Sequence, residues 1–463
     1  ADVIKLTAQF APPEQFNLVP GGRYYFDLSA MDIPGTVNSN LPDSTLHYVP
    51  FTYAGTVDAY SMENETDTAK QPYEHSLFIA DYNVKCSLQR ETLAEMNLIY
   101  GQTYTASNVN YTLRAPSVGD HHRNEGEGSG LAPIDNEWDT IYQKSADYIK
   151  NWYKMRSFGQ DIGTGNVEGM YLSRGGHFAA QATFWARPTL PERDIGFRPV
   201  LEVLNSDTLG SDGMKVVTLD LNGGKLGGSS EDIQIIVKNG STFTAPMSGG
   251  LTRPDGDTGS YFMWLDGNGN SYEPGGSVPA DVTTLTVQWT APTYAVTLHT
   301  NGGTINNGNV TEYTYGVGAA LPTDVTRTGY TFKGWYDNEG LTGDPVTAIG
   351  NTETGNKEYW AKWEINQYTI TYDLAGGTAE GNPNTYTIET GAFTLKNPTK
   401  SGYTFTGWSG TGLDGENNMT VTIHTGSTGN RTYTAHWRYN GSGHSYSYYT
   451  IKATAGAGGS ISP

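Results

Sequence analysis

Polar and apolar residues alternate in short runs along much of the chain, and glycine-rich turns separate the runs. In the run YTITYDL, Tyr368, Ile370 and Tyr372 fall on one side of an extended backbone, and polar residues fall on the other. A period of two predicts half-buried β-strands. Such runs open and close the stretches 215–290, 294–363 and 368–437, so we predict three β-rich modules there.

The three stretches share one frame, which indicates a tandem repeat. Each closes on a tryptophan, and Trp289, Trp363 and Trp437 follow one another at intervals of 74 residues. The second and third carry GYTFKGW and GYTFTGW, whereas the first has the diverged centre TGSYFMWLDGNG. A Gly-Gly pair follows the opening strand of each module, and we expect turns or bulges with positive φ at these pairs.

The aromatic residues of the GYTFxGW motif alternate with small or polar residues. A module of about 70 residues needs its large aromatic side chains for its own core. We therefore expect packing residues rather than a ligand shelf at Tyr330, Phe332 and Trp335, and at Tyr403, Phe405 and Trp408.

These features make residues 215–437 resemble the Listeria–Bacteroides repeat, the type found as the B repeats of internalin B. The resemblance implies a small β-grasp-like module that occurs in arrays on secreted or wall-bound bacterial proteins. Residues 438–463 have the composition of a Gly/Ser/Tyr linker followed by the start of a truncated further repeat.

Residues 1–205 show no repeat and predict an α+β domain. Strand-like runs alternate with two helical patterns, SLQRETLAEM, with Ser87 as its N-cap, and NEWDTIYQKSADYIKNW, which places apolar residues from Trp138 to Trp152. We expect a helix at each of these two sites.

The end of this domain reads RGGHFAAQATFWARPTLPERDIGFRPVLEV from Arg174. It is similar to the end of the C-type-lectin-like fold of formylglycine-generating enzymes, where an Arg-Gly-Gly start, a central arginine, here Arg187, and a Gly-Phe-Arg strand ending at Arg198 recur. The resemblance implies a C-type-lectin-like head followed by tandem β-rich, β-grasp-like modules. Relatives of this fold include ligand-binding proteins diversified by retroelements. Their binding residues precede the Gly-Phe-Arg strand, at 155–193 in this chain.

The residues in that window suit a recognition surface, because aromatic and arginine side chains supply contact area and directed hydrogen bonds. The alternative is that the aromatics pack in the core and the arginines satisfy buried carbonyl groups. The candidate ligand-binding residues are Arg156, Phe158, Tyr171, Arg174, His177, Phe178, Phe184, Trp185 and Arg187.

Charge and chemical motifs narrow the possible functions. The formal net charge of −20, from 28 basic and 48 acidic residues, disfavours nucleic acid as a partner. The only cysteine, Cys86, rules out an internal disulfide and lies far from the matching motif, so the cysteine chemistry of the enzymes is not expected. DGNGN from Asp266 lacks the later ligands of a calcium loop, and DHHRNEGEGSG from Asp120 reads as a loop, so we expect no metal or cofactor.

The sequence therefore predicts a non-enzymatic bacterial protein, secreted or on the cell surface or wall, without an apolar run long enough to span a membrane. Its head would bind a protein or glycan ligand on another cell or on a phage, and the repeats would display the head. Two alternatives stay open. One is a degenerate oxidase-like or carbohydrate-active enzyme head with a deep polar pocket, and the other is a purely structural spacer.

Overall fold

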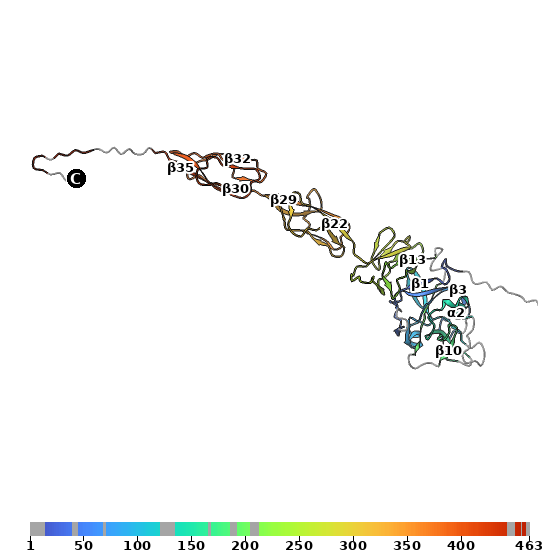
Figure 1. Ribbon diagram of the computed structural model, residues 1–463. Helices are drawn as coiled ribbons and strands as arrows, with labels where there is room; N and C mark the ends of the chain where they lie inside the picture. Colours follow the sequence, from blue (N-terminus) through green and yellow to red (C-terminus); the bar gives the residue numbers. More distant parts are fainter. Residues whose placement is uncertain are drawn as a thin grey trace, which may run out of the picture. The chain divides into compact units, whose positions relative to one another are not determined.

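The computed structural model describes residues 14–38, 45–67, 71–120, 135–164, 168–185, 192–203, 213–441, 450–454 and 456–459. The chain divides into two compact units, Ala1–Ala291 and Pro292–Pro463. Strands dominate both units, as the alternating pattern predicts, and the helices are few and short (Figure 1).

The N-terminal domain, which we call the head, contains two six-stranded sheets. The first has the order β1 (Arg23–Phe26), β3 (Val49–Ala59), β4 (Tyr73–Ala80), β12 (Val200–Val203), β7 (Val109–Arg114) and β6 (Gln102–Ala106). The second has the order β10 (Ala182–Trp185), β9 (Tyr171–Gly175), β8 (Arg156–Ile162), β11 (Glu192–Phe197), β5 (Lys85–Leu88) and β2 (Thr36–Val37).

The two predicted helices form, but both are shorter than predicted. Helix α1 spans Arg90–Glu95, and Ser87 is not its cap, because the Ser87 backbone is left-handed at φ 55° and Gln89 occupies the N-cap position. Helix α2 spans Glu137–Lys144 and begins where the Asn136 side chain accepts a hydrogen bond from the Asp139 amide at 2.9 Å. It ends because Ser145 is extended, and a 3₁₀ turn, η1 (Ala146–Tyr148), follows.

The three repeat modules share one sheet topology. In each, the opening strand pairs in parallel with the closing strand, and the strand of the central motif adds antiparallel to the closing strand. The first module contains β15 (Ile233–Lys238), β13 (Met214–Asp220), β21 (Thr284–Gln288), β18 (Met263–Leu265) and β19 (Ser271–Tyr272), with the ribbons β14 (Lys225–Leu226) and β17 (Leu251–Thr252), and β16 (Phe243–Thr244) and β20 (Ser277–Val278).

The second and third modules repeat this order with four-stranded sheets. The second contains β24 (Glu312–Thr314), β22 (Thr293–His299), β29 (Lys357–Ile365) and β27 (Tyr330–Tyr336), with the ribbons β23 (Thr304–Ile305) and β26 (Val325–Thr326), and β25 (Ala319–Ala320) and β28 (Ala348–Ile349). The third contains β31 (Thr385–Tyr386), β30 (Tyr368–Asp373), β35 (Arg431–Tyr439) and β33 (Tyr403–Gly410), with the ribbon β32 (Phe393–Thr394) and β34 (Thr422–Ile423).

The Gly-Gly pairs differ from the prediction at their second residue. The first glycine of each pair has positive φ, as in Gly376 at 83°, but Gly377 does not. A Cβ on Gly377 would lie 2.4 Å from Cζ2 of Trp437, and the matching glycines meet Trp289 and Trp363 at 2.3 and 2.2 Å. The second glycine is therefore needed because the ring of the closing tryptophan lies against the backbone, which explains why the two features recur together.

The phenylalanines and tryptophans of the central motif pack in the module cores, as predicted, whereas Tyr330 and Tyr403 are half-buried and lie outside the core clusters. Trp335 is buried, its indole N–H donates to the carbonyl of Pro322 at 2.8 Å, and Phe332 packs between the rings of Trp335 and Trp363. Trp264 takes the same place in the first module and donates to the carbonyl of Pro246 at 2.7 Å. The diverged centre of the first module therefore keeps the residue that its core requires.

The first module shares its core with the head. Met214 and Ile236 are buried in the main hydrophobic cluster of the head, and Tyr48 of the head is buried in the cluster of the module. The Lys238 amide donates to the carbonyl of Ser107 at 3.1 Å. The head and the first module therefore make one compact unit, to which the second and third modules do not belong.

Candidate functional site

Three of the nine candidate residues lie inside the head. Phe158 is buried among the apolar residues of the main cluster. Tyr171 is buried, its hydroxyl donates to Glu91 at 2.7 Å, and its ring lies 4.5 Å from the Arg90 guanidinium. Arg174 is fully buried. These side chains occupy the positions that the packing alternative assigned to them.

Three other candidates lie at or near the surface. His177 is exposed, and Phe178 exposes 49% of its area. Arg156 is half-buried and pairs with Asp194. Phe184 and Trp185 belong to strand β10, and Arg187 lies outside the described residues.

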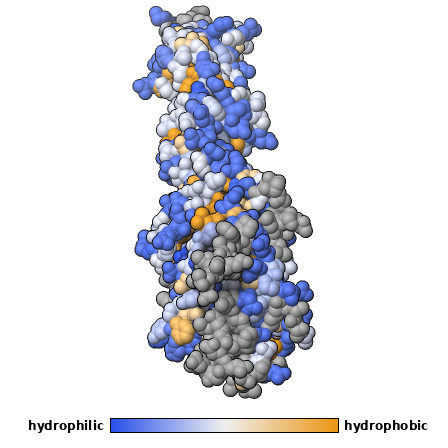
Figure 2. Space-filling model, turned by 90° about the vertical axis from the view of Figure 1, so that its right-hand side faces the viewer, coloured by the Kyte–Doolittle hydropathy of each residue, from blue (hydrophilic) through white to orange (hydrophobic). Residues whose placement is uncertain are grey.

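A residue outside the predicted window completes the exposed group. Tyr153 exposes 63% of its area, and its backbone forms a parallel bridge with Gly176. The Lys154 amide donates to the carbonyl of Gly176 at 2.7 Å, which holds the two segments side by side. We call Tyr153, His177 and Phe178 the aromatic surface. On the face that Figure 2 displays, hydrophobic residues form separate groups among polar ones. Tyr153 and Phe178 place two large exposed aromatic side chains on adjoining segments.

Arg198, the last residue of the Gly-Phe-Arg strand motif, holds the segment that carries Tyr153. Its guanidinium donates to the carbonyls of Lys150 at 2.8 Å and Asn151 at 3.2 Å. It also donates to the hydroxyl of Ser157 at 3.0 Å. Burial lowers the pKa of Arg198 to about 10, while Asp81 acts to raise it, so the guanidinium remains charged at neutral pH.

Arg174, the first residue of the Arg-Gly-Gly motif, holds the segment that carries Phe178. Its guanidinium pairs with Asp139 of helix α2 and donates to the carbonyl of Ala180 at 3.2 Å. Gly176 adopts φ 112°, a backbone conformation that disfavours other residues, directly before His177. The two motif arginines thus fix the two segments that carry the aromatic surface, and the buried Arg174 is not itself part of that surface.

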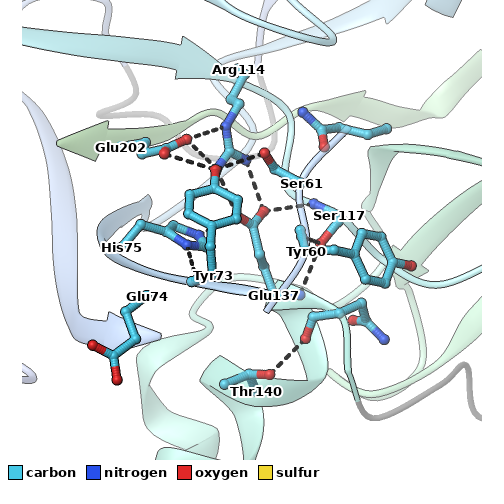
Figure 3. Close-up of polar contacts among 12 residues, drawn as sticks. Tyr60, Ser61, Tyr73, Glu74, His75, Arg114, Ser117, Glu137, Thr140 and Glu202 are labelled. Carbon is cyan, nitrogen blue, oxygen red and sulfur yellow. Dashed lines mark hydrogen bonds and ion pairs between the residues drawn. The ribbon is translucent and has the colours of Figure 1, made fainter. Parts of the chain in front are cut away.

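A cluster of charged side chains lies in the interior of the head (Figure 3). The Arg114 guanidinium donates to both carboxylate oxygens of Glu137, at 2.6 and 2.8 Å, and to Glu202 at 2.7 Å. His75 Nε2 lies 2.7 Å from Glu137, and Tyr73 donates to Glu202 at 2.8 Å. The cluster joins strands β4, β7 and β12 to the start of helix α2.

The geometry of this cluster sets its charges. His75 Nδ1 lies 2.8 Å from the carbonyl oxygen of Tyr73, which can only accept, so Nδ1 carries a proton. Burial acts to raise the pKa of Glu137, but Arg114 and His75 outweigh it and lower the pKa from 4.5 to about 2. The guanidinium of Arg114 thus compensates the buried charge of Glu137, as a buried ion pair requires.

The interior cluster links several elements of the head, and its central side chains are buried. The side chains of His75, Arg114 and Glu137 are at most 1% exposed, and those of Arg114 and Glu137 point toward one another in Figure 3. Cys86 is also buried, and its sulfur lies 3.5 Å from the Thr36 hydroxyl. The centre of the cluster and the Cys86 thiol are thus both shielded from solvent.

Within the described part of the chain, no group of three or more His, Cys, Asp or Glu side chains is arranged to hold a metal ion. The His121 and His122 segment lies outside the described residues. Asp266 accepts hydrogen bonds from Asn268, Asn270 and Tyr272, so the DGNGN stretch is a turn closed by its own side chains. No helix in the described residues is long and apolar enough to cross a bilayer.

Comparison with known proteins confirms two of the repeats. Residues 294–362 and 368–436 each match the Listeria–Bacteroides repeat domain. A protein named as a Gly-rich membrane protein of Evansella cellulosilytica is 30% identical over 181 residues, which are 38% of this chain and 18% of that protein. Internalin H of Listeria monocytogenes is 34% identical over 106 residues, which are 22% of this chain and 18% of that protein. The chain thus spans about a fifth of the length of these curated relatives, and it contains two Listeria–Bacteroides repeats.

Proposed function

We propose that the chain is part of a secreted or surface-attached bacterial adhesin-like protein whose head binds an external ligand without catalysis. Listeria–Bacteroides repeats in residues 294–436 and the similarity to an internalin and to a protein named for a membrane support the surface location. The repeats carry the head, and the head recognises a protein or glycan on another cell or on a phage.

The aromatic surface is the observation that carries the binding proposal. Tyr153 and Phe178 are large, half-exposed or more, and fixed on adjoining backbone segments. Rigid aromatic side chains supply contact area at a low cost in conformational entropy, which makes them frequent binding hot spots. Lys154, whose ammonium lies 5.2 Å from the Tyr153 ring, and the exposed His177 add polar groups at the rim.

The proposed fold of the head is C-type-lectin-like. The Arg-Gly-Gly and Gly-Phe-Arg motifs support it, because Arg174 braces a segment inside the window 155–193, where the related binding proteins display their ligand contacts, and Arg198 braces the segment directly before that window. The exposed candidates within the window, His177 and Phe178, are the contact residues that we retain.

Hydrogen exchange of the whole chain tests this proposal. The chain is first screened against immobilised oligosaccharides and against surface proteins extracted from bacterial and animal cells. With a probe that binds, we expect slower exchange at residues 150–156 and 175–181 and unchanged exchange at residues 294–437. Protection confined to the repeats would move the binding function from the head to the repeats.

A further inference from the structure

A cavity of about 450 Å³ lies where the first sheet of the head meets the first repeat module. Strands β1 and β6 are the two edges of that sheet. The sheet is curled, so that these two edges lie close together. The Phe26 and Tyr104 rings are 6.4 Å apart, and the Tyr104 hydroxyl donates to the carbonyl of Asp27 at 2.9 Å. Residues of β15 and β16 close the remaining gap from the module side.

The cavity wall is mainly aromatic and apolar. Tyr48 donates from its hydroxyl to the carbonyl of Met247, so one side chain of the head fixes the wall contributed by the module. Met247 is 54% exposed and stands at the mouth. The aromatic and methionine side chains of the wall are Tyr25, Phe26, Met31, Tyr48, Tyr104 and Met247.

Asp27 is the only charged side chain among the described residues that line the cavity. Its carboxylate is 28% exposed, accepts from the Ser29 amide at 2.9 Å and lies 3.4 Å from Nδ1 of His47. Burial raises the pKa of Tyr48 and of Tyr104 well above 10, so both remain neutral phenols. No lysine or arginine of the described wall offsets the carboxylate.

We propose that this cavity is a second ligand site, for a small organic cation that carries an ammonium group on an aromatic or alkyl body. Its volume lies within the range of about 300–1,000 Å³ that is usual for small-molecule sites. The ammonium pairs with Asp27 and the body packs on the aromatic wall, an arrangement that favours cations. An anionic ligand of the same shape is repelled by Asp27 and by the net charge of −20.

Three probes with one ring and different charges test the proposal on the whole chain. Tyramine carries an ammonium, 4-ethylphenol is neutral, and 3-(4-hydroxyphenyl)propionate carries a carboxylate. By isothermal titration calorimetry we expect saturable binding of tyramine, with the other two weaker by about tenfold or more. In Asp27→Asn, tyramine falls to the level of 4-ethylphenol. No saturable binding of tyramine, or equal binding of the three probes, overturns the proposal.

Matched variants locate the binding in the cavity. Thr244 lines the cavity and belongs to β16, whose two residues are Phe-Thr. Thr394 is the matching control, because it is the exposed threonine of the Phe-Thr strand β32 in the third module. Thr244→Trp fills the space and abolishes tyramine binding, whereas Thr394→Trp binds as the unchanged chain does. Equal binding by both variants places tyramine elsewhere and refutes the site. Asp27→Asn removes the charge without changing the packing volume. A circular dichroism spectrum equal to that of the unchanged chain shows that lost tyramine binding results from the lost charge and not from unfolding.

Discussion

Replacement of Ala375 by asparagine should stabilise the third repeat module. Ala375 precedes the Gly-Gly pair and is held in the left-handed backbone region at φ 46°. The matching residues of the other modules are Asn222, at φ 47°, and Asn301, at φ 50°. Their side-chain amides donate to the carbonyls of Val287 and Ala361 at 2.9 and 2.8 Å. The third module alone has a residue here that cannot make this bond.

The size of the effect follows from two contributions. The left-handed conformation costs a residue such as alanine roughly 1–2 kcal/mol, a cost that asparagine partly avoids. A new hydrogen bond to the carbonyl of Ala435, the counterpart of Ala361, adds about 1 kcal/mol. We therefore expect Ala375→Asn to raise the free energy of unfolding of the module by about 1–2 kcal/mol. For a module of this size that raises its Tm by roughly 4–16 °C.

Hydrogen exchange of the whole chain during a denaturant series reports each module separately. Ala375→Asn should raise the denaturant midpoint at β30 and β35 and leave β22 and β29 unchanged. Ala375→Gly relieves the backbone strain without the bond, so its stability should lie between those of the other two. Asn301→Ala is the reverse change and should destabilise the second module by a similar amount. An Ala375→Asn chain that is folded but no more stable than the parent would refute this reasoning.

Three further predictions concern packing and charge. Gly377→Ala should destabilise the third module by about 1–3 kcal/mol, since the added Cβ meets the Trp437 ring. Faster hydrogen exchange at β35 would show this loss of stability. Because the pKa of Glu137 is lower in the folded head than when unfolded, its stabilising effect is complete above pH 4.5 and is lost toward pH 2. Urea unfolding curves should therefore show that the free energy of unfolding falls by about 3 kcal/mol between pH 4.5 and pH 2. Glu137→Gln should remove this pH dependence and should also lower the free energy of unfolding at neutral pH. Ile236→Ala should cost about 2–5 kcal/mol and lower the urea midpoint of head strands as well as module strands, whereas a loss confined to the module would contradict the shared core.

The repeats could be predicted from the sequence because their features are local and periodic. Alternation placed the strands, and the closing tryptophans and Gly-Gly pairs marked the module bounds. The reason for the second glycine was not visible, because Gly377 and Trp437 are far apart in the sequence and meet only in the folded module. The burial of Met214 and Ile236 in the core of the head also depends on contacts between residues far apart in the sequence, so no sequence pattern predicts it.

Less of the candidate site could be predicted, because residue type does not reveal burial. Phe158, Tyr171 and Arg174 have the composition of a recognition surface, yet all three are buried. Tyr153 was missed, since it precedes the window set by the resemblance and reaches the aromatic surface only through its bridge to Gly176. An aromatic residue in a polar, turn-rich segment was the one available signal.

The proposed binding function is tested most directly by a double variant of the whole chain in which Tyr153 and Phe178 are both changed to alanine. The measured quantity is its affinity for the probe that binds the unchanged chain most tightly in the screen. Loss of two hot-spot aromatics should weaken binding by about 2 kcal/mol or more, roughly 30-fold. Tyr439→Ala removes an aromatic that is 68% exposed on the third module and should bind as the unchanged chain does. Full affinity in the double variant, with loss in Tyr439→Ala, would show that the repeats and not the head bind the ligand.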